Sequence, residues 1–293
     1  MKPGFIRTAA LLLCMVLGAL LPQAHVGKGA IPSLVAGMLF IVFLHARLGR
    51  GTLRASHFVL LAVNVAMGFA GWGLGALVGG PEVGRAGFFA GITPTATAAP
   101  VIMGFLGGQV EYVVAAFMLT NLSVVALLPG LLPLVLGRPS PDLFGQVLAT
   151  VTLVVLIPLA AAWVVRTIHP PATAWPRHLR NVSFGAWLLA VFLAMANASH
   201  FLLTQPVRMV VLAQIAGVSA VVCAANFALG RVVGGAQFGR EGSQALGQKN
   251  TAFSIALAIT YAGPLVALGP TFYVLWHNLW NSWQLHREAR RGG

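Results

Sequence analysis

The chain has 293 residues, of which 58% are hydrophobic and only 8% are charged. Soluble domains carry about a quarter charged residues, so this composition excludes an ordinary soluble enzyme. The mean hydropathy of +0.86 reflects apolar runs along nearly the whole length, which predicts one polytopic membrane domain. Eighteen Lys and Arg against five Asp and Glu give a net charge of +13, which points to membrane topology, an anionic ligand or nucleic acid.

About ten apolar runs are long enough to cross the roughly 30 Å core of a bilayer as helices. We therefore expect an all-α protein with about ten transmembrane helices. The first run follows Lys2 and Arg7 and also resembles a signal peptide, although no convincing small-residue cleavage site follows it. The runs cover residues 6–22, 30–46, 57–79, 87–107, 110–136, 143–165, 182–203, 207–230, 236–262 and 264–285.

Basic residues resist translocation and gather in cytoplasmic loops, so their distribution predicts the orientation. With the N-terminus inside, four basic residues lie on the far side, namely Lys28, Arg85, Arg138 and Arg208. The cytoplasmic set has thirteen members: Lys2, Arg7, Arg47, Arg50, Arg54, Arg166, Arg177, Arg180, Arg231, Arg240, Arg287, Arg290 and Arg291. We expect a multi-pass protein of a bacterial inner membrane, with both termini cytoplasmic, lipid around it and no nucleic-acid partner.

Ten helices with both ends inside divide into two inverted repeats of five, residues 1–137 and 138–293. This plan is typical of secondary transporters. The fourth and ninth runs hold equivalent places in the two halves, and polar, Gly-rich or Pro-rich segments interrupt them at residues 91–100 and 241–250. Non-helical backbone at membrane depth is tolerated only beside protein or a water-filled cavity, so the paired interruptions predict a central site.

Four residues of the first interruption are candidate substrate contacts: Pro94, Thr95, Thr97 and Pro100. Each proline removes a backbone donor and clashes with the preceding turn. The threonine hydroxyls could face a ligand or satisfy carbonyls freed by the break. A proline-kinked packing helix, with threonines bonded to their own backbone, is the structural alternative.

Lys249 is the strongest single candidate for a functional residue. Inserting an ammonium at the bilayer centre costs about 2.5–3.5 kcal/mol, even on the insertion scales that give the lowest cost. It could bind an anionic substrate group, replace a bound cation, or gain and lose a proton during transport. A lysine held by carbonyls only for packing is the structural alternative. Gln248 and Asn250 flank it, and Asn64 and Asn121 in other runs are either ligand contacts or interhelical hydrogen bonds.

Metal and catalytic patterns are missing from the sequence. Cys14 and Cys223 are isolated in apolar runs, which indicates core residues. We expect no metal, no cofactor and no enzymatic activity, because no paired carboxylate or histidine set lies at membrane depth.

The two interrupted segments resemble those of the bile acid:sodium symporter family. Residues 245–253 and 256–258 are similar to the family's E-x-G-M-Q-N-x-G-L-x-x-A-L-A stretch, which a basic residue precedes, here Arg240. Residues 97–101 are similar to its T-A-S-N-V, and residues 64–67 to its Q-F-x-M. The resemblance extends over the whole chain and implies ten helices in two inverted repeats, with helices four and nine unwound where they cross.

This chain departs from the family at the positions that supply sodium ligands. Ala245 stands for the family's glutamate, Lys249 for its glutamine, and Ala99 and Pro100 for its serine and asparagine. Losing a carboxylate and gaining an ammonium opposes a bound cation, since two like charges 4 Å apart repel by about 4 kcal/mol at an effective dielectric of 20. The departures predict that Lys249 replaces the sodium charge.

The sequence therefore predicts a secondary transporter that moves a small or amphipathic organic anion by alternating access, as a uniport or coupled to protons. Sodium is not expected as a partner. One alternative is a sodium-coupled symporter whose cation sites are rebuilt from Asn64, Asn121, Gln244 and backbone carbonyls. Another is a membrane binding protein that does not transport.

Overall fold

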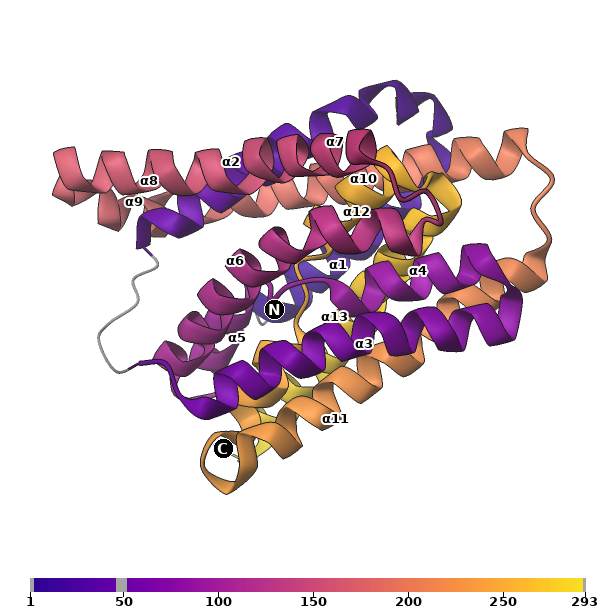
Figure 1. The fold of residues 1–293 in the computed structure, drawn as a ribbon. Helices are drawn as coiled ribbons and strands as arrows, with labels where there is room; N and C mark the ends of the chain where they lie inside the picture. The colour runs from indigo at the N-terminus through magenta and orange to yellow at the C-terminus, as the bar shows by residue number, and fades with distance from the viewer. Residues whose placement is uncertain (1–2, 46–51, 292–293) are drawn as a thin grey trace.

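The computed structural model describes residues 3–45 and 52–291, and most of these residues are helical (Figure 1). No strand occurs within these ranges, only one isolated bridge between two residues. The helices, with three shorter 3-10 or π segments, are α1 (Pro3–Leu20), η1 (Pro22–Ala30), α2 (Ile31–His45), α3 (Ala55–Gly79), α4 (Pro81–Ile92), α5 (Ala99–Phe105), α6 (Val110–Val135), α7 (Pro141–Val151), η2 (Thr152–Leu156), α8 (Ile157–Ile168), η3 (Pro170–Ala174), α9 (Trp175–His178), α10 (Arg180–Thr204), α11 (Met209–Gly247), α12 (Thr251–Tyr261) and α13 (Pro264–Arg291).

Six helical segments of the described chain are long and apolar enough to cross a membrane. The prediction of an all-α membrane protein is thereby confirmed. Two further apolar helices, at Ala9–Leu20 and Thr251–Tyr261, are shorter. The six segments are Pro22–Leu44, Ala55–Gly79, Val110–Val135, Pro141–Ile168, Asn181–Thr204 and Met209–Gly247.

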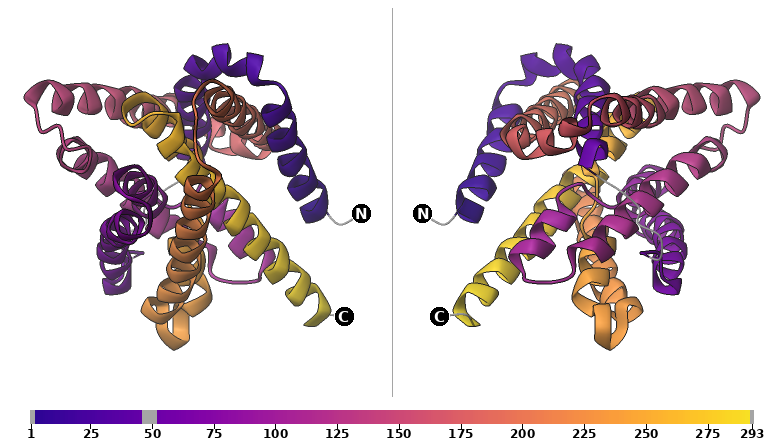
Figure 2. Two further views of the ribbon diagram at one scale, coloured as in Figure 1. Left: turned by 90° about the vertical axis from the view of Figure 1, so that its right-hand side faces the viewer. Right: turned by 90° about the vertical axis from the view of Figure 1, so that its left-hand side faces the viewer.

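The helices form two groups with different packing partners. In the first, α3, α4, α11 and α13 pack most extensively on one another, and in the second, α1, α2, α8 and α10 do so together with η1. Figure 1 shows α2, α8 and α10 running together above α3 and α11, and the two turned views separate the same groups (Figure 2). The second interrupted segment leads into α12, which contacts α13 and α4 of the first group and α2 and α10 of the second.

Two tight helical hairpins in the first group depend on glycine. Gly80, with φ of +82°, joins α3 to α4, and a Cβ atom on Gly71 of α3 would collide with the Gly87 carbonyl of α4. Within α11 the chain reverses at Gly235, with φ of +62°, and Gly230 contacts Gly242 in the same way. Each hairpin leads directly into one of the two interrupted segments.

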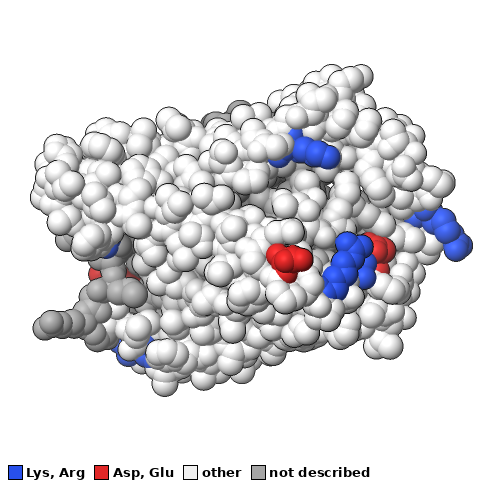
Figure 3. Space-filling model, turned by 45° about the horizontal axis from the view of Figure 1, so that its top comes forward, with Lys and Arg blue, Asp and Glu red and all other residues white. Residues whose placement is uncertain are grey.

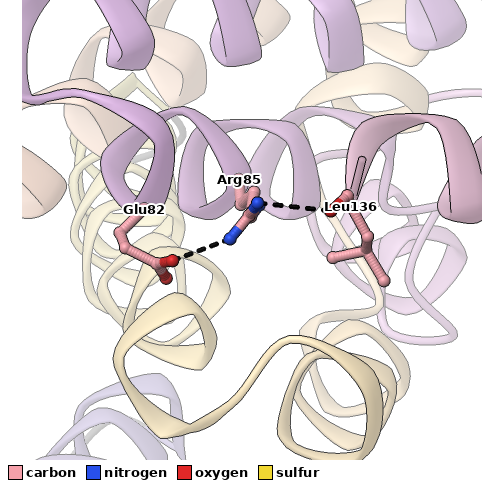
Figure 4. Close-up of polar contacts among 3 residues, drawn as sticks. All are labelled: Glu82, Arg85 and Leu136. Carbon is pink, nitrogen blue, oxygen red and sulfur yellow. Dashed lines mark hydrogen bonds and ion pairs between the residues drawn. The ribbon is translucent and has the colours of Figure 1, made fainter. Parts of the chain in front are cut away.

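Charged side chains are sparse on the face seen in Figure 3, most of which is uncharged. One charged contact fixes the N-terminal end of α4: Arg85 pairs with Glu82 at 2.7 Å and donates a hydrogen bond to the Leu136 carbonyl at 3.2 Å, just beyond α6 (Figure 4). Part of the predicted cytoplasmic basic set lies outside the described residues: Lys2, Arg47, Arg50 and the side chains of Arg7, Arg177, Arg180, Arg290 and Arg291.

Candidate functional site at the helix crossover

The helical ladder is interrupted at two segments that meet in the interior. The first runs from Thr93 to Ala98, between α4 and α5, and the second from Gln248 to Asn250, between α11 and α12. The second break is shorter than predicted, because residues 241–247 are helical. The polar and glycine residues there were wrongly interpreted as part of the interruption; Gly242 and Gly247 instead allow close packing on Gly230 and Phe227.

A short antiparallel bridge joins the two breaks. Thr95 pairs with Lys249, Ala96 N–H donates to the Gln248 carbonyl at 2.7 Å, and Asn250 N–H donates to the Pro94 carbonyl at 2.8 Å. These bonds satisfy buried backbone groups that the helices leave without partners. We call this bridge and the side chains around it the crossover.

Lys249 lies at the centre of the crossover and is only 1% exposed. Its Nζ donates hydrogen bonds to the carboxamide oxygen of Asn64 on α3 and, at 3.1 Å, to the carbonyl oxygen of Gly91 on α4. The Asn64 amide in turn donates to the Ile92 carbonyl at 3.0 Å. No carboxylate forms an ion pair with Lys249 within the described residues.

The groups around the Lys249 amine are oxygen acceptors of the kind that bind a positively charged donor. The last carbonyl oxygens of α4 have no N–H partner within the helix. A helix C-terminus also carries a partial negative charge. Gly91 and Ile92 supply two of these carbonyls, and Lys249 and Asn64 donate to them. Oxygen atoms of unwound backbone and half-helix C-terminal ends are the groups that hold a coupling cation in broken-helix transporters. An ammonium here occupies a place suited to a cation.

Thr95 links the crossover to α6 and α11. Its hydroxyl donates to the Ala245 carbonyl at 2.6 Å, and its N–H donates to the Thr120 hydroxyl at 3.2 Å. Asn121 donates from its amide to the Thr95 carbonyl at 2.9 Å. Thr95 is 1% exposed and Thr120 and Asn121 are each 2% exposed, so these bonds form in the interior.

The remaining predicted residues contribute backbone atoms to the crossover or lie beside it. Asn250 contributes its backbone N–H, and Pro94 its carbonyl. Pro100 and the fully buried Ala99 lie in the first turn of α5, and Thr97 lies half-buried in the turn before it. Gln248 faces α13, where its carboxamide oxygen accepts a hydrogen bond from Asn281 at 2.5 Å.

Three crossover residues were not singled out from the sequence. Tyr273 of α13 donates to the Gly247 carbonyl at 2.9 Å and thereby caps the C-terminal end of α11. Ser254 of α12 lies 2.7 Å from the Thr93 hydroxyl, and Thr120 of α6 joins Thr95 as described above. An isolated Tyr, Ser or Thr in an apolar helix is too common to be a signal on its own, so only the contacts reveal them.

No protein-family model matches the chain, and neither does any curated protein. The resemblance in the interrupted segments and the geometry of the crossover are therefore the basis for any statement about function.

Proposed function

We propose that this protein is a secondary transporter with the fold of the bile acid:sodium symporter family. In this proposal it moves a small or amphipathic organic anion across a bacterial inner membrane by alternating access, without sodium. Both termini are cytoplasmic, as the distribution of basic residues indicates. The observation that carries the proposal is the buried ammonium of Lys249 on the Gly91 carbonyl and the Asn64 carboxamide oxygen, between two broken helices.

The order of elements supports two inverted repeats of five. In the first, α1, α2 and α3 precede the interrupted pair α4 and α5, and α6 follows. In the second, the continuous segment of α7, η2 and α8 precedes α10 and the first half of α11; the interrupted pair and α13 follow. Each interrupted pair is entered through a glycine-packed hairpin, which is the expected result of one duplicated plan.

The crossover favours replacement of the cation over direct binding of a substrate anion by Lys249. The side chain is buried and two of its three N–H groups have acceptors in the protein. A bound cation would need the same oxygens and would meet a like charge beside them. The Asn64 oxygen that a rebuilt sodium site requires is thus already taken by Lys249.

Uptake into proteoliposomes tests this function. The purified chain is reconstituted, and entry of a panel of labelled organic anions is compared with that into protein-free vesicles. Saturable uptake of an anion that is equal in sodium chloride and choline chloride supports the proposal. Uptake that sodium removal abolishes supports the sodium symporter instead, and saturable binding without entry of any anion supports a binding protein.

A further inference from the structure

A half-open cavity of about 190 Å³ lies between α12 and the segment formed by η1 and the start of α2, and Lys249 does not line it. Lys28, Ile31 and Pro32, from η1 and the start of α2, line one side of it, and Ala256, Ile259 and Thr260 of α12 line the other. The two walls therefore belong to segments that are far apart in sequence.

The α12 wall connects this cavity to the crossover. Helix α12 begins at Thr251, two residues after Lys249, and Ala256 lies about 8 Å further along its axis at 1.5 Å per residue. A ligand in the cavity would contact both α2 and the half-helix that leaves the crossover. Binding there would thus be sensitive to any movement of α12 against α2.

The chemistry of the walls matches an amphipathic monoanion. Lys28 is exposed and supplies one positive charge, whereas Ile31, Pro32, Ala256 and Ile259 present apolar surface. No acidic residue is among those that line the cavity. A carboxylate at Lys28 would form a charge-assisted hydrogen bond, and the body of the ligand would cover apolar side chains.

The volume limits the size of that body. Ligand pockets for drug-sized molecules measure about 300–1,000 Å³, and an engineered cavity of about 150 Å³ accepts benzene. A half-open cavity of about 190 Å³ covers a ligand body of about the size of a single ring or a short branched chain.

We propose that this cavity binds monocarboxylates with an apolar body of about the size of a benzene ring, and that Lys28 holds the carboxylate. Binding of such an acid in the cavity does not depend on the proposed function. The inference that this acid is also the transported substrate does rest on the proposed function.

Benzoate is the probe, and its binding to the purified full chain in nanodiscs is measured by calorimetry. Lys28→Gln removes the charge from an exposed position, and Ile259→Trp fills the apolar part of the cavity. Arg208→Gln is the matched control, because it removes one exposed positive charge at the start of α11. We expect each cavity variant to weaken benzoate binding about tenfold or more, with the control equal to the wild type.

The proposal is overturned if the wild type does not bind benzoate, or if Lys28→Gln binds it as tightly as the wild type does. Because Lys28 is exposed, this variant does not depend on repacking of the interior. Uptake in proteoliposomes separates the two proposals. If the variants weaken benzoate binding but no anion enters the vesicles, the proposed binding site is supported and the proposed transport is contradicted. If a steroid acid enters the vesicles but benzoate does not bind, the proposed transport is supported and the proposed binding of monocarboxylates in the cavity is contradicted.

Discussion

Lys249 and Asn64 are 185 positions apart in the sequence, and the lysine ammonium donates a hydrogen bond to the asparagine carboxamide oxygen. This bond connects the break between α11 and α12 to α3, and through Asn64 to the end of α4 at Ile92. The Lys249 amine thereby links α3 and the C-terminal end of α4 to the break between α11 and α12.

Replacing this charge by an apolar side chain should destabilise the protein. Lys249→Met leaves the Asn64 oxygen and the Gly91 carbonyl without the donor they have now, and a buried unsatisfied polar group costs about 1–3 kcal/mol. We expect a lower melting temperature in detergent by differential scanning fluorimetry. Lys28→Met is the control, because Lys28 is exposed. Equal melting temperatures for the two variants would mean that the bonds of Lys249 do not stabilise the crossover.

Removing the hydroxyl of Thr95 should weaken the crossover while keeping the shape of the side chain. Thr95→Val loses the hydrogen bond to the Ala245 carbonyl, which contributes about 0.5–1.5 kcal/mol net and more if the carbonyl stays unsatisfied. The expected result is a lower melting temperature and slower anion uptake. Thr97→Val makes the same chemical change in the half-buried turn two residues later. The interpretation fails if Thr97→Val has the larger effect on either measurement.

Two glycines on α3 predict opposite effects of the same substitution. A Cβ atom at Gly71 would collide with the Gly87 backbone, whereas one at Gly73 meets nothing within 4 Å. Gly71→Ala should therefore separate α3 from α4 and lower the melting temperature. Gly73→Ala should leave it equal or raise it, because alanine favours the helix by about 1 kcal/mol over glycine. A Gly71→Ala protein as stable as the wild type would contradict the close packing of this hairpin.

The sequence predicted the positions of both breaks because prolines, threonines and a lysine are costly in apolar helices. The start of the second break was predicted wrongly, because a glycine in a helix either interrupts the helix or allows another segment to pack closely against it. Gly242 and Gly247 were interpreted as breaking the helix, yet they remain helical and allow contact with Gly230 and Phe227. Composition along one chain does not distinguish a glycine that breaks a helix from one that packs against a distant backbone.

Helix length explains why the fourth and ninth predicted spans are not among the six long apolar segments. The break after Ile92 leaves α4 with 12 residues and α5 with 7, and the break before Thr251 leaves α12 with 11. Each is shorter than the roughly 20 residues that cross a bilayer. Tyr273 and Ser254 were missed for a different reason, since their partners lie on other helices and no local pattern marks them.

Thermal unfolding in sodium chloride and in choline chloride, at equal ionic strength, shows whether the crossover binds sodium. A ligand that binds only the folded state at about 100 times its dissociation constant stabilises that state by about 2.7 kcal/mol. A working sodium site would therefore raise the melting temperature in sodium alone. Under the proposal that the Lys249 ammonium replaces the cation, we predict the same melting temperature in both salts, and a rise specific to sodium would contradict that replacement.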